Sequence, residues 1–155
     1  MAIKDSTNWR AFEFETTRLM TAEYKRKAVK HLMVIGESVV KYARDDKSLA
    51  RHYTDRTGNL RSSIGYVVVQ DGMIAFSSFD GNTEKGKAAG RNYAIEVAQS
   101  LSPNKTYLVW VAGMEYASYV EAKGFDVISG SGNWLESNIV KEREKFKRYL
   151  LSNRE

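Results

Sequence analysis

Apolar residues recur at helical spacing along the first third of the chain. The positions, three or four residues apart, are Tyr24, Ala28, Leu32, Ile35, Val39 and Tyr42. This spacing places their side chains on one face of a helix. No proline interrupts residues 9–43, so the pattern predicts one long helix from Trp9 to Ala43. Gly36 costs a helix interior about 1 kcal/mol relative to alanine, which we explain by the close approach of another backbone.

A β-hairpin is predicted immediately after a polar stretch that ends in the turn-forming residues 55–59. Two runs rich in β-branched and aromatic residues, Ser63–Val69 and Met73–Phe79, flank the dipeptide Asp71-Gly72. Asp-Gly between two such runs is a strong short-range hairpin signal.

The middle of the chain predicts a loop, a helix and a central strand. Residues 80–90 contain Gly81, Gly86 and Gly90 and are predicted to form a loop. Arg91–Leu101 has helical character, and Pro103 ends it. Thr106–Ala112 is apolar at successive positions, which is typical of a strand covered on both faces.

The last third predicts two short elements, a flexible segment and a final helix. We expect a short helix over Glu115–Ala122, a short strand over Phe125–Ile128 and flexibility over Ser129–Asn133. Trp134–Ser152 has amphipathic spacing. The element order predicts a single α+β domain over residues 1–155, with a small, mainly antiparallel sheet packed on helices and a flexible excursion at about 80–104.

Composition narrows the classes of function. The chain has 155 residues, no cysteine and a net charge of +5. Disulfides, thiolate metal sites and a cysteine nucleophile are therefore excluded. No stretch reaches the roughly 18 apolar residues that span a bilayer, and the N-terminus lacks a signal-peptide pattern, so we expect no membrane partner. The positive charge is compatible with an anionic neighbour or with a solvated lysine-rich surface.

Reactive side chains do not form a recognisable catalytic or metal-binding pattern. His31 lies at the edge of the apolar stripe and is predicted to be partly buried, while His52 lies in a polar stretch, away from metal-ligand spacing. Ser131 is not in a nucleophile elbow. Glu115 and Glu121, six positions apart, would point to different faces of a helix. We therefore expect no catalytic residue, no metal and no cofactor, and hence no enzyme activity.

One segment imitates a phosphate-binding loop. Residues 81–88 match G-x-x-x-x-G-K and follow a predicted strand. A phosphate loop needs Ser or Thr after the lysine to bind magnesium, but Ala88 follows Lys87. The strand also belongs to a hairpin and not to a parallel βαβ unit. We therefore favour a mobile basic loop that could contact protein or DNA.

Two stretches together resemble the head–tail joining family of tailed bacteriophages, also called tail-completion or neck proteins. The first stretch, T-G-x-L-x-x-S-I, consists here of Thr57, Gly58, Leu60, Ser63 and Ile64. The second, Glu115–Gly124, looks like the family's Y-A-x-Y-V-E-x-G and contains Tyr116, Ala117, Tyr119, Val120, Glu121 and Gly124. Ser118 stands where many members have proline. We expect these residues to pack the core and shape turns.

The resemblance implies a structural protein of the virion, made in the bacterial cytoplasm and located at the head–tail interface. It implies a homo-oligomeric ring, six-fold or twelve-fold, that contacts other neck, portal or tail proteins and lets duplex DNA pass through its lumen. The candidates for a surface facing DNA or a neighbouring subunit are Lys25, Arg26, Lys27, Lys85, Lys87 and Arg91. The two glycine-containing loops, residues 81–90 and 129–133, are expected to become ordered on assembly.

Two alternatives remain open from the sequence. A tail-terminator or minor tail subunit would assemble in a related way. A small basic nucleic-acid-binding module would also account for the charge, although no helix-turn-helix, RNP or zinc motif supports it.

Overall fold

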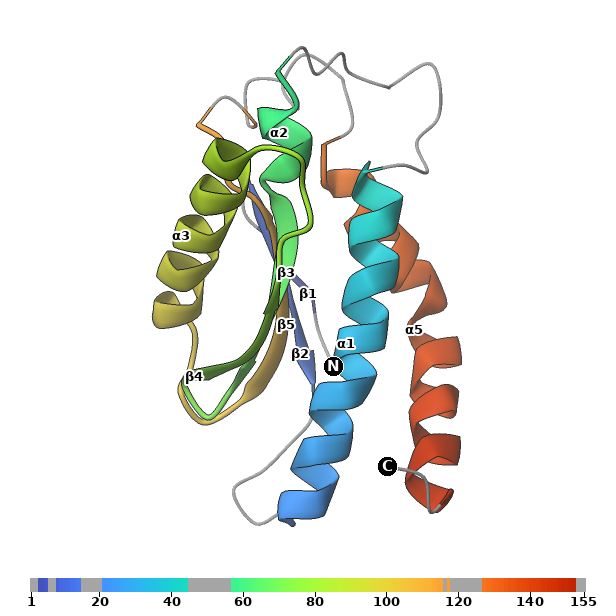
Figure 1. Cartoon of the computed structure of the whole chain (residues 1–155). Helices are drawn as coiled ribbons and strands as arrows, with labels where there is room; N and C mark the ends of the chain where they lie inside the picture. Colours follow the sequence, from blue (N-terminus) through green and yellow to red (C-terminus); the bar gives the residue numbers. More distant parts are fainter. Residues whose placement is uncertain are drawn as a thin grey trace.

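Helices and one antiparallel sheet make up the part of the chain that the computed structural model describes, which comprises residues 3–5, 8–14, 21–44, 57–115, 117 and 127–152. This arrangement confirms the predicted α+β class (Figure 1). The elements are β1 (Ile3–Asp5), β2 (Trp9–Phe14), α1 (Ala22–Arg44), α2 (Asn59–Ser62), β3 (Ile64–Gln70), β4 (Met73–Ser78), α3 (Glu84–Ser100), β5 (Thr106–Ala112) and α5 (Ser129–Leu151).

The sheet has five strands in the order β1-β2-β5-β3-β4, and every neighbouring pair is antiparallel. As predicted, β5 is central, and all seven of its residues are buried. The predicted hairpin is confirmed as β3 and β4. Asp71 and Gly72 have φ values of 53° and 80°, and positive φ at both central residues is what a type I′ turn requires.

Helices cover both faces of the sheet (Figure 1). α1 and α5 pack side by side on one face, over Tyr66, Leu108 and Trp110. α3 lies on the opposite face and buries Ala94 and Val97 against valines of β3 and β5. The buried valines alternate between the two cores along each strand, because successive side chains in a strand point to opposite faces.

The N-terminal helix is shorter than predicted. Trp9–Phe14 is the strand β2, paired with β5 along its whole length, and α1 begins only at Ala22. The local pattern Phe12-Glu13-Phe14 has period two, which suits a strand, but the absence of proline and glycine extended the helical prediction across it. Thr21 caps the true start, where its Oγ1 accepts the N–H of Tyr24 at 3.1 Å.

The predicted helix over Arg91–Leu101 is confirmed within α3 (Glu84–Ser100), but the predicted loop over 80–90 is wrong from Glu84 onward, so residues 80–104 are not a loop excursion. α3 begins at Glu84, where the side chain of Thr83 accepts the N–H of Gly86. The glycines serve close packing: a Cβ at Gly86 would lie 2.4 Å from the carbonyl oxygen of Asn59, and one at Gly90 would lie 2.6 Å from that of Ser63. They allow α3 to pack tightly against α2 and the start of β3, whereas glycines of a mobile loop would have open space around them.

The prediction of flexibility at Ser129–Asn133 was also wrong, because these residues form the first turns of α5. Val127 and Ile128 are buried bends, so the predicted fourth short strand does not extend over them; the other half of that range, 125–126, lies outside the described residues. Of the predicted short helix over 115–122, Glu115 lies in a turn and Ala117 is helical and buried, and the remaining positions lie outside the described part.

The glycine at position 36 makes room for a side chain, that of Tyr66, and not for another backbone as the sequence suggested. A Cβ at this position would lie 2.5 Å from ring carbons of Tyr66. The ring of Tyr66 therefore lies directly against α1. Its hydroxyl donates to the carboxylate of Glu37 at 2.8 Å and also lies 3.1 Å from the carbonyl oxygen of Met33, an alternative acceptor. The glycine allows α1 to pack flat on β3.

Candidate functional site

The first family-like stretch forms a tight structural junction. Gly58 has φ 79° and ψ 0°, a left-handed conformation that favours glycine, and it precedes the single helical turn α2. Thr57 accepts the N–H of Asn59 through its side chain at 3.2 Å. Leu60 and Ile64 are fully buried in the core between the sheet and α1. These placements agree with the packing and turn roles expected from the sequence.

Ser63, in the first family-like stretch, is hydrogen-bonded to the residues just before the second stretch. Its hydroxyl donates to the carbonyl oxygen of Leu60 at 2.7 Å and accepts the N–H of Met114 at 3.3 Å. Its carbonyl oxygen accepts the N–H of Gly113 at 3.2 Å. Ala117 is buried in the same core. Tyr116, Tyr119, Val120, Glu121 and Gly124 lie outside the residues whose side chains are described.

The segment that imitates a phosphate loop uses its backbone donors internally. The N–H groups of Asn82 and Thr83 donate to the hydroxyl of Ser62 at 2.9 and 3.2 Å, and that of Gly86 donates to Thr83. Lys87 is paired with Glu84 at 2.7 Å. A phosphate cradle needs such N–H groups directed at the ligand, so this segment is a helix cap packed on α2.

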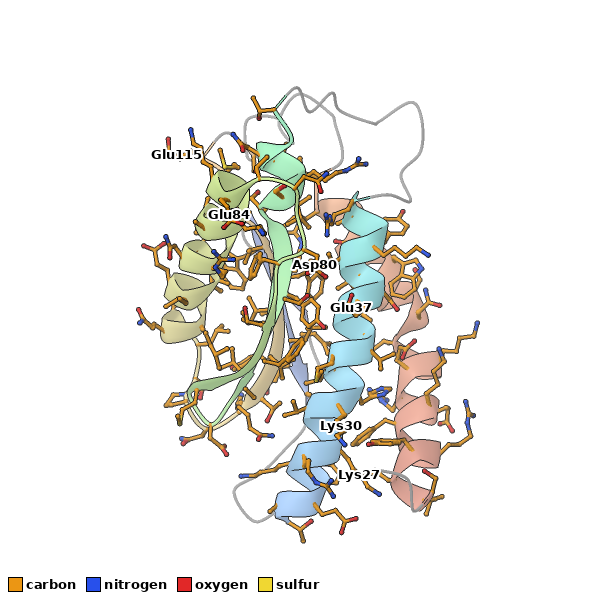
Figure 2. The ribbon with its side chains drawn as sticks, viewed as in Figure 1. Lys27, Lys30, Glu37, Asp80, Glu84 and Glu115 are labelled. Atoms are coloured by element: carbon orange, nitrogen blue, oxygen red, sulfur yellow. The ribbon has the colours of Figure 1, made fainter. Side chains whose placement is uncertain are left out.

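The basic residues named as candidates for facing DNA or a neighbouring subunit lie in two different parts of the molecule. Lys27 and Lys30 lie on the N-terminal half of α1, whereas Glu84, which begins α3 and pairs with Lys87, lies at the other end (Figure 2). Lys85 and Arg91 are exposed on α3. The candidates on α1 and those on α3 therefore form two separate basic regions.

Lys27 is not available to a DNA partner. The residue is only 5% exposed, and its ammonium lies 3.6 Å from the carboxylate of Glu23 and 5.5 Å from the centre of the Tyr149 ring. It also donates to the carbonyl oxygen of Ser152 at 3.4 Å. Lys25 is engaged as well, in an ion pair with Asp71 at 3.0 Å. Lys27 therefore joins α1 to the end of α5.

Positive charge is concentrated on the two-helix layer. α1 carries six lysines and arginines against two glutamates, and α5 carries five lysines and arginines against three glutamates. The layer thus has an excess of six positive charges, more than the whole chain's +5. On α5, five of these residues are exposed: Lys141, Arg143, Lys145, Lys147 and Arg148. Sequence reasoning missed this layer, because it searched for short basic clusters and did not combine helices distant in the chain.

A second surface feature is the open edge of the sheet at β4. No described strand lies outside β4, and its burial differs sharply from that of β3, its fully paired neighbour. Met73 is 74% exposed and Ile74 is 40% exposed. The sequence predicted the hairpin, but its apolar residues did not indicate which strand would be the edge.

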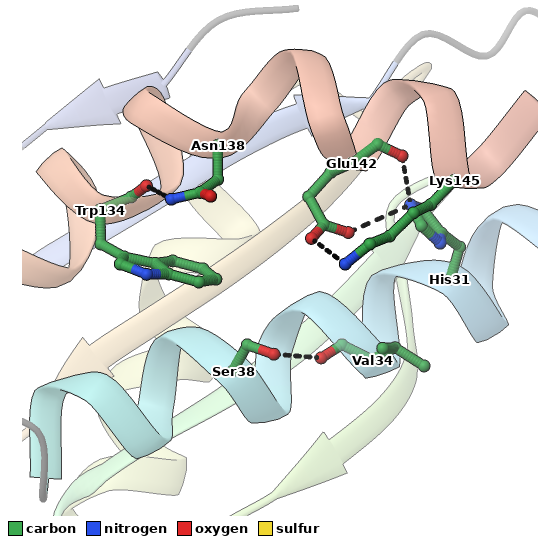
Figure 3. A network of polar contacts seen from close by, with 7 residues as sticks. All are labelled: His31, Val34, Ser38, Trp134, Asn138, Glu142 and Lys145. Carbon is green, nitrogen blue, oxygen red and sulfur yellow. Dashed lines mark hydrogen bonds and ion pairs between the residues drawn. The ribbon is translucent and has the colours of Figure 1, made fainter.

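A polar cluster joins α1 to α5 within the charged layer (Figure 3). His31 is buried, and its Nε2–H donates to the carbonyl oxygen of Glu142 at 3.1 Å. The carboxylate of Glu142 lies 3.9 Å from the same nitrogen and accepts a hydrogen bond from Lys145 at 3.1 Å. Burial lowers the pKa of His31 from 6.5, against the opposing attraction of Glu142. His31 is therefore neutral at pH 7, and more deeply buried than the sequence predicted.

We expect the free energy of unfolding to fall as the pH is lowered below about 6.5, and to fall less in His31→Gln. The unfolded chain binds a proton at His31 near pH 6.5, while the folded chain binds it only at lower pH, so acid favours the unfolded state by up to about 1.4 kcal/mol per unit of pKa difference. Urea unfolding at pH 7.5, 6.5 and 5.5 measures the effect, and His52 is common to both proteins. If the free energy of unfolding fell equally with pH in the two proteins, His31 would not be the group whose pKa burial lowers.

Neither a metal centre nor a membrane span is found in the described part of the chain. Within those ranges no three His, Asp or Glu side chains are grouped so as to hold a metal ion. The helices described there are also too short or too polar to cross a bilayer.

No protein-family model, curated protein or solved structure matches the sequence or the fold.

Proposed function

We propose that this protein is a structural subunit of a tailed-bacteriophage virion that joins head to tail by assembling into a ring. The observation that carries the proposal is the junction at Ser63. Its hydrogen bonds to Leu60 and Met114 connect the first stretch that resembles the head–tail joining family to the segment that leads directly into the second. The described residues of that resemblance lie in the core and in turns, which suits a protein whose function is assembly.

The surface also suits assembly. One edge of the sheet is open at β4, and the charged layer of α1 and α5 lies on one face. A subunit that presents two different patches makes head-to-tail contacts, and these close into a ring when the rotation between copies permits. A tail-terminator or minor tail subunit would assemble by the same principle.

The test is the mass of the purified protein by light scattering, from micromolar to near-millimolar concentration. The proposal predicts a discrete oligomer whose population rises with concentration. A monomer at every concentration contradicts it.

The charged layer favours one alternative, a nucleic-acid-binding module. Such a module would bind a short DNA duplex as a monomer, and the affinity would fall steeply with salt because bound lysines and arginines release counterions. Titration of a fluorescent duplex at 50 and 200 mM salt separates the two proposals. Salt-dependent binding by a protein that stays monomeric would favour the module.

A further inference from the structure

The outer edge of β4 lacks most of the features that keep edge strands from pairing. Natural edges are usually blocked by charged residues, by proline, or by a covering helix or loop. The sequence of β4, Met-Ile-Ala-Phe-Ser-Ser, contains neither a charged residue nor a proline. Among the residues that the structure describes, the one such feature is a bulge: Val68 pairs with Phe76 and Val69 with Ile74, so Ala75 is the extra residue.

Apolar side chains are exposed along the same edge. Met73 and Ile74 follow the turn directly and are among the most exposed large apolar residues described. Ala75 is exposed too. Phe76, by contrast, packs on Tyr66 with ring centres 5.9 Å apart, so it anchors the strand and leaves its first half uncovered.

We propose that the outer edge of β4 pairs with a strand from a second copy of this chain. The inference rests on the proposed function, for which it identifies the surface of subunit contact. Strand pairing would satisfy the backbone N–H and C=O groups along the edge, and it would bury Met73 and Ile74.

The charge distribution favours a second copy as the partner. Two copies with a net charge of +5 each repel one another over most of their surfaces. The repulsion is weakest where they meet at a neutral edge. Near the turn, the carboxylate of Asp71 neutralises Lys25 at 3.0 Å. An acidic or basic partner protein would find no complementary charge on β4 itself.

Strand directions connect this contact to the form of the assembly. All neighbouring strands are antiparallel, so β4 and β1, at opposite edges, point the same way. A two-fold axis would pair β4 with β4 of the other copy antiparallel and give a dimer. Repetition by rotation would pair β4 with the neighbour's β1 in parallel, and that pairing can continue around a ring.

The test is a lysine at the edge, compared with a lysine elsewhere on the surface. Ile74→Lys introduces a charge into β4, as natural edges do. Val140→Lys is the matched control, because Val140 is 67% exposed on α5 and far from the edge in sequence and fold. We expect Ile74→Lys to raise the dissociation constant for self-association by roughly tenfold or more, while Val140→Lys leaves it unchanged. Circular dichroism confirms that both variants fold.

A second measurement reports the backbone directly. Hydrogen exchange of the amides of residues 73–78 is compared at micromolar and near-millimolar concentration. The inference predicts slower exchange in β4 at high concentration in the unmodified protein and in Val140→Lys, but not in Ile74→Lys. Unchanged exchange in an oligomer, or equal association by the two variants, overturns it.

The outcomes separate the inference from the proposed function. Dimers that depend on Ile74 support the contact at β4 and contradict the ring. Rings that are indifferent to Ile74→Lys support the ring and overturn the contact at β4.

Discussion

Replacing Trp110 with alanine is expected to lower the free energy of unfolding by about 3–5 kcal/mol, the usual range for removing a large buried aromatic side chain. Trp110 is fully buried at the centre of β5. Its indole N–H donates to the hydroxyl of Ser131 at 2.9 Å, and Ser131 in turn donates to the carbonyl oxygen of Ile128. The side chain thus fastens the first turn of α5 to the middle of the sheet. Urea unfolding at micromolar concentration measures the loss.

The contribution of the hydrogen bond is tested separately by Ser131→Ala. This change leaves the buried indole N–H without its acceptor, which costs about 1–3 kcal/mol. The matched control is Ser137→Ala, at an exposed position of the same helix where the hydroxyl only returns to the carbonyl oxygen of Asn133; surface changes of this kind usually stay within about 0.5 kcal/mol. If residues 129–133 were a flexible loop, the two serine variants would be equally stable.

Replacing Gly90 with alanine is expected to destabilise the protein by about 2 kcal/mol, although alanine is the better helix former. The new Cβ would lie 2.6 Å from the carbonyl oxygen of Ser63 and 2.6 Å from the ring of Phe79. Overpacking of this kind costs about 1–3 kcal/mol or more, and the backbone oxygen cannot move aside alone. The gain in helix propensity, about 1 kcal/mol, offsets only part of that cost.

Gly132→Ala provides the control for Gly90→Ala. At this glycine of α5 the nearest atoms to a new Cβ belong to the flexible side chain of Arg10, at 3.3 Å or more. We expect no loss of stability, or a gain of up to about 1 kcal/mol from helix propensity. Thermal and urea unfolding of both variants measure the difference in stability. A neutral or stabilising Gly90→Ala would contradict the close packing of α3 on the start of β3.

The elements with a strong local pattern were predictable from the sequence. Asp71-Gly72 between β-branched runs predicted the β3–β4 hairpin, and the continuous apolar run from Thr106 to Ala112 predicted the central strand. The α+β class followed from their order. In each case the local preference and the final environment agree, so the nearest residues in sequence sufficed.

The errors share a physical cause, which is that the deciding contacts are distant in sequence. β2 is a strand because it pairs with β5, about a hundred residues later. From the sequence alone, Gly86 and Gly90 indicated a flexible loop. In the fold they allow close packing against Asn59 and Ser63, which are distant in sequence. For the candidate site, the motif residues that the structure describes (Thr57, Gly58, Leu60, Ser63, Ile64 and Ala117) lie at the turn and packing positions expected for them. The combined charge of α1 and α5 and the open edge at β4 depend on which elements lie side by side.

Negative-stain images of the concentrated protein test the central claim most directly. Assembly as a ring-forming virion subunit predicts closed particles of one diameter with a central hole, and class averages that give a single rotational symmetry. Isolated monomers, or particles without a hole at concentrations where light scattering shows that association is complete, would contradict the claim.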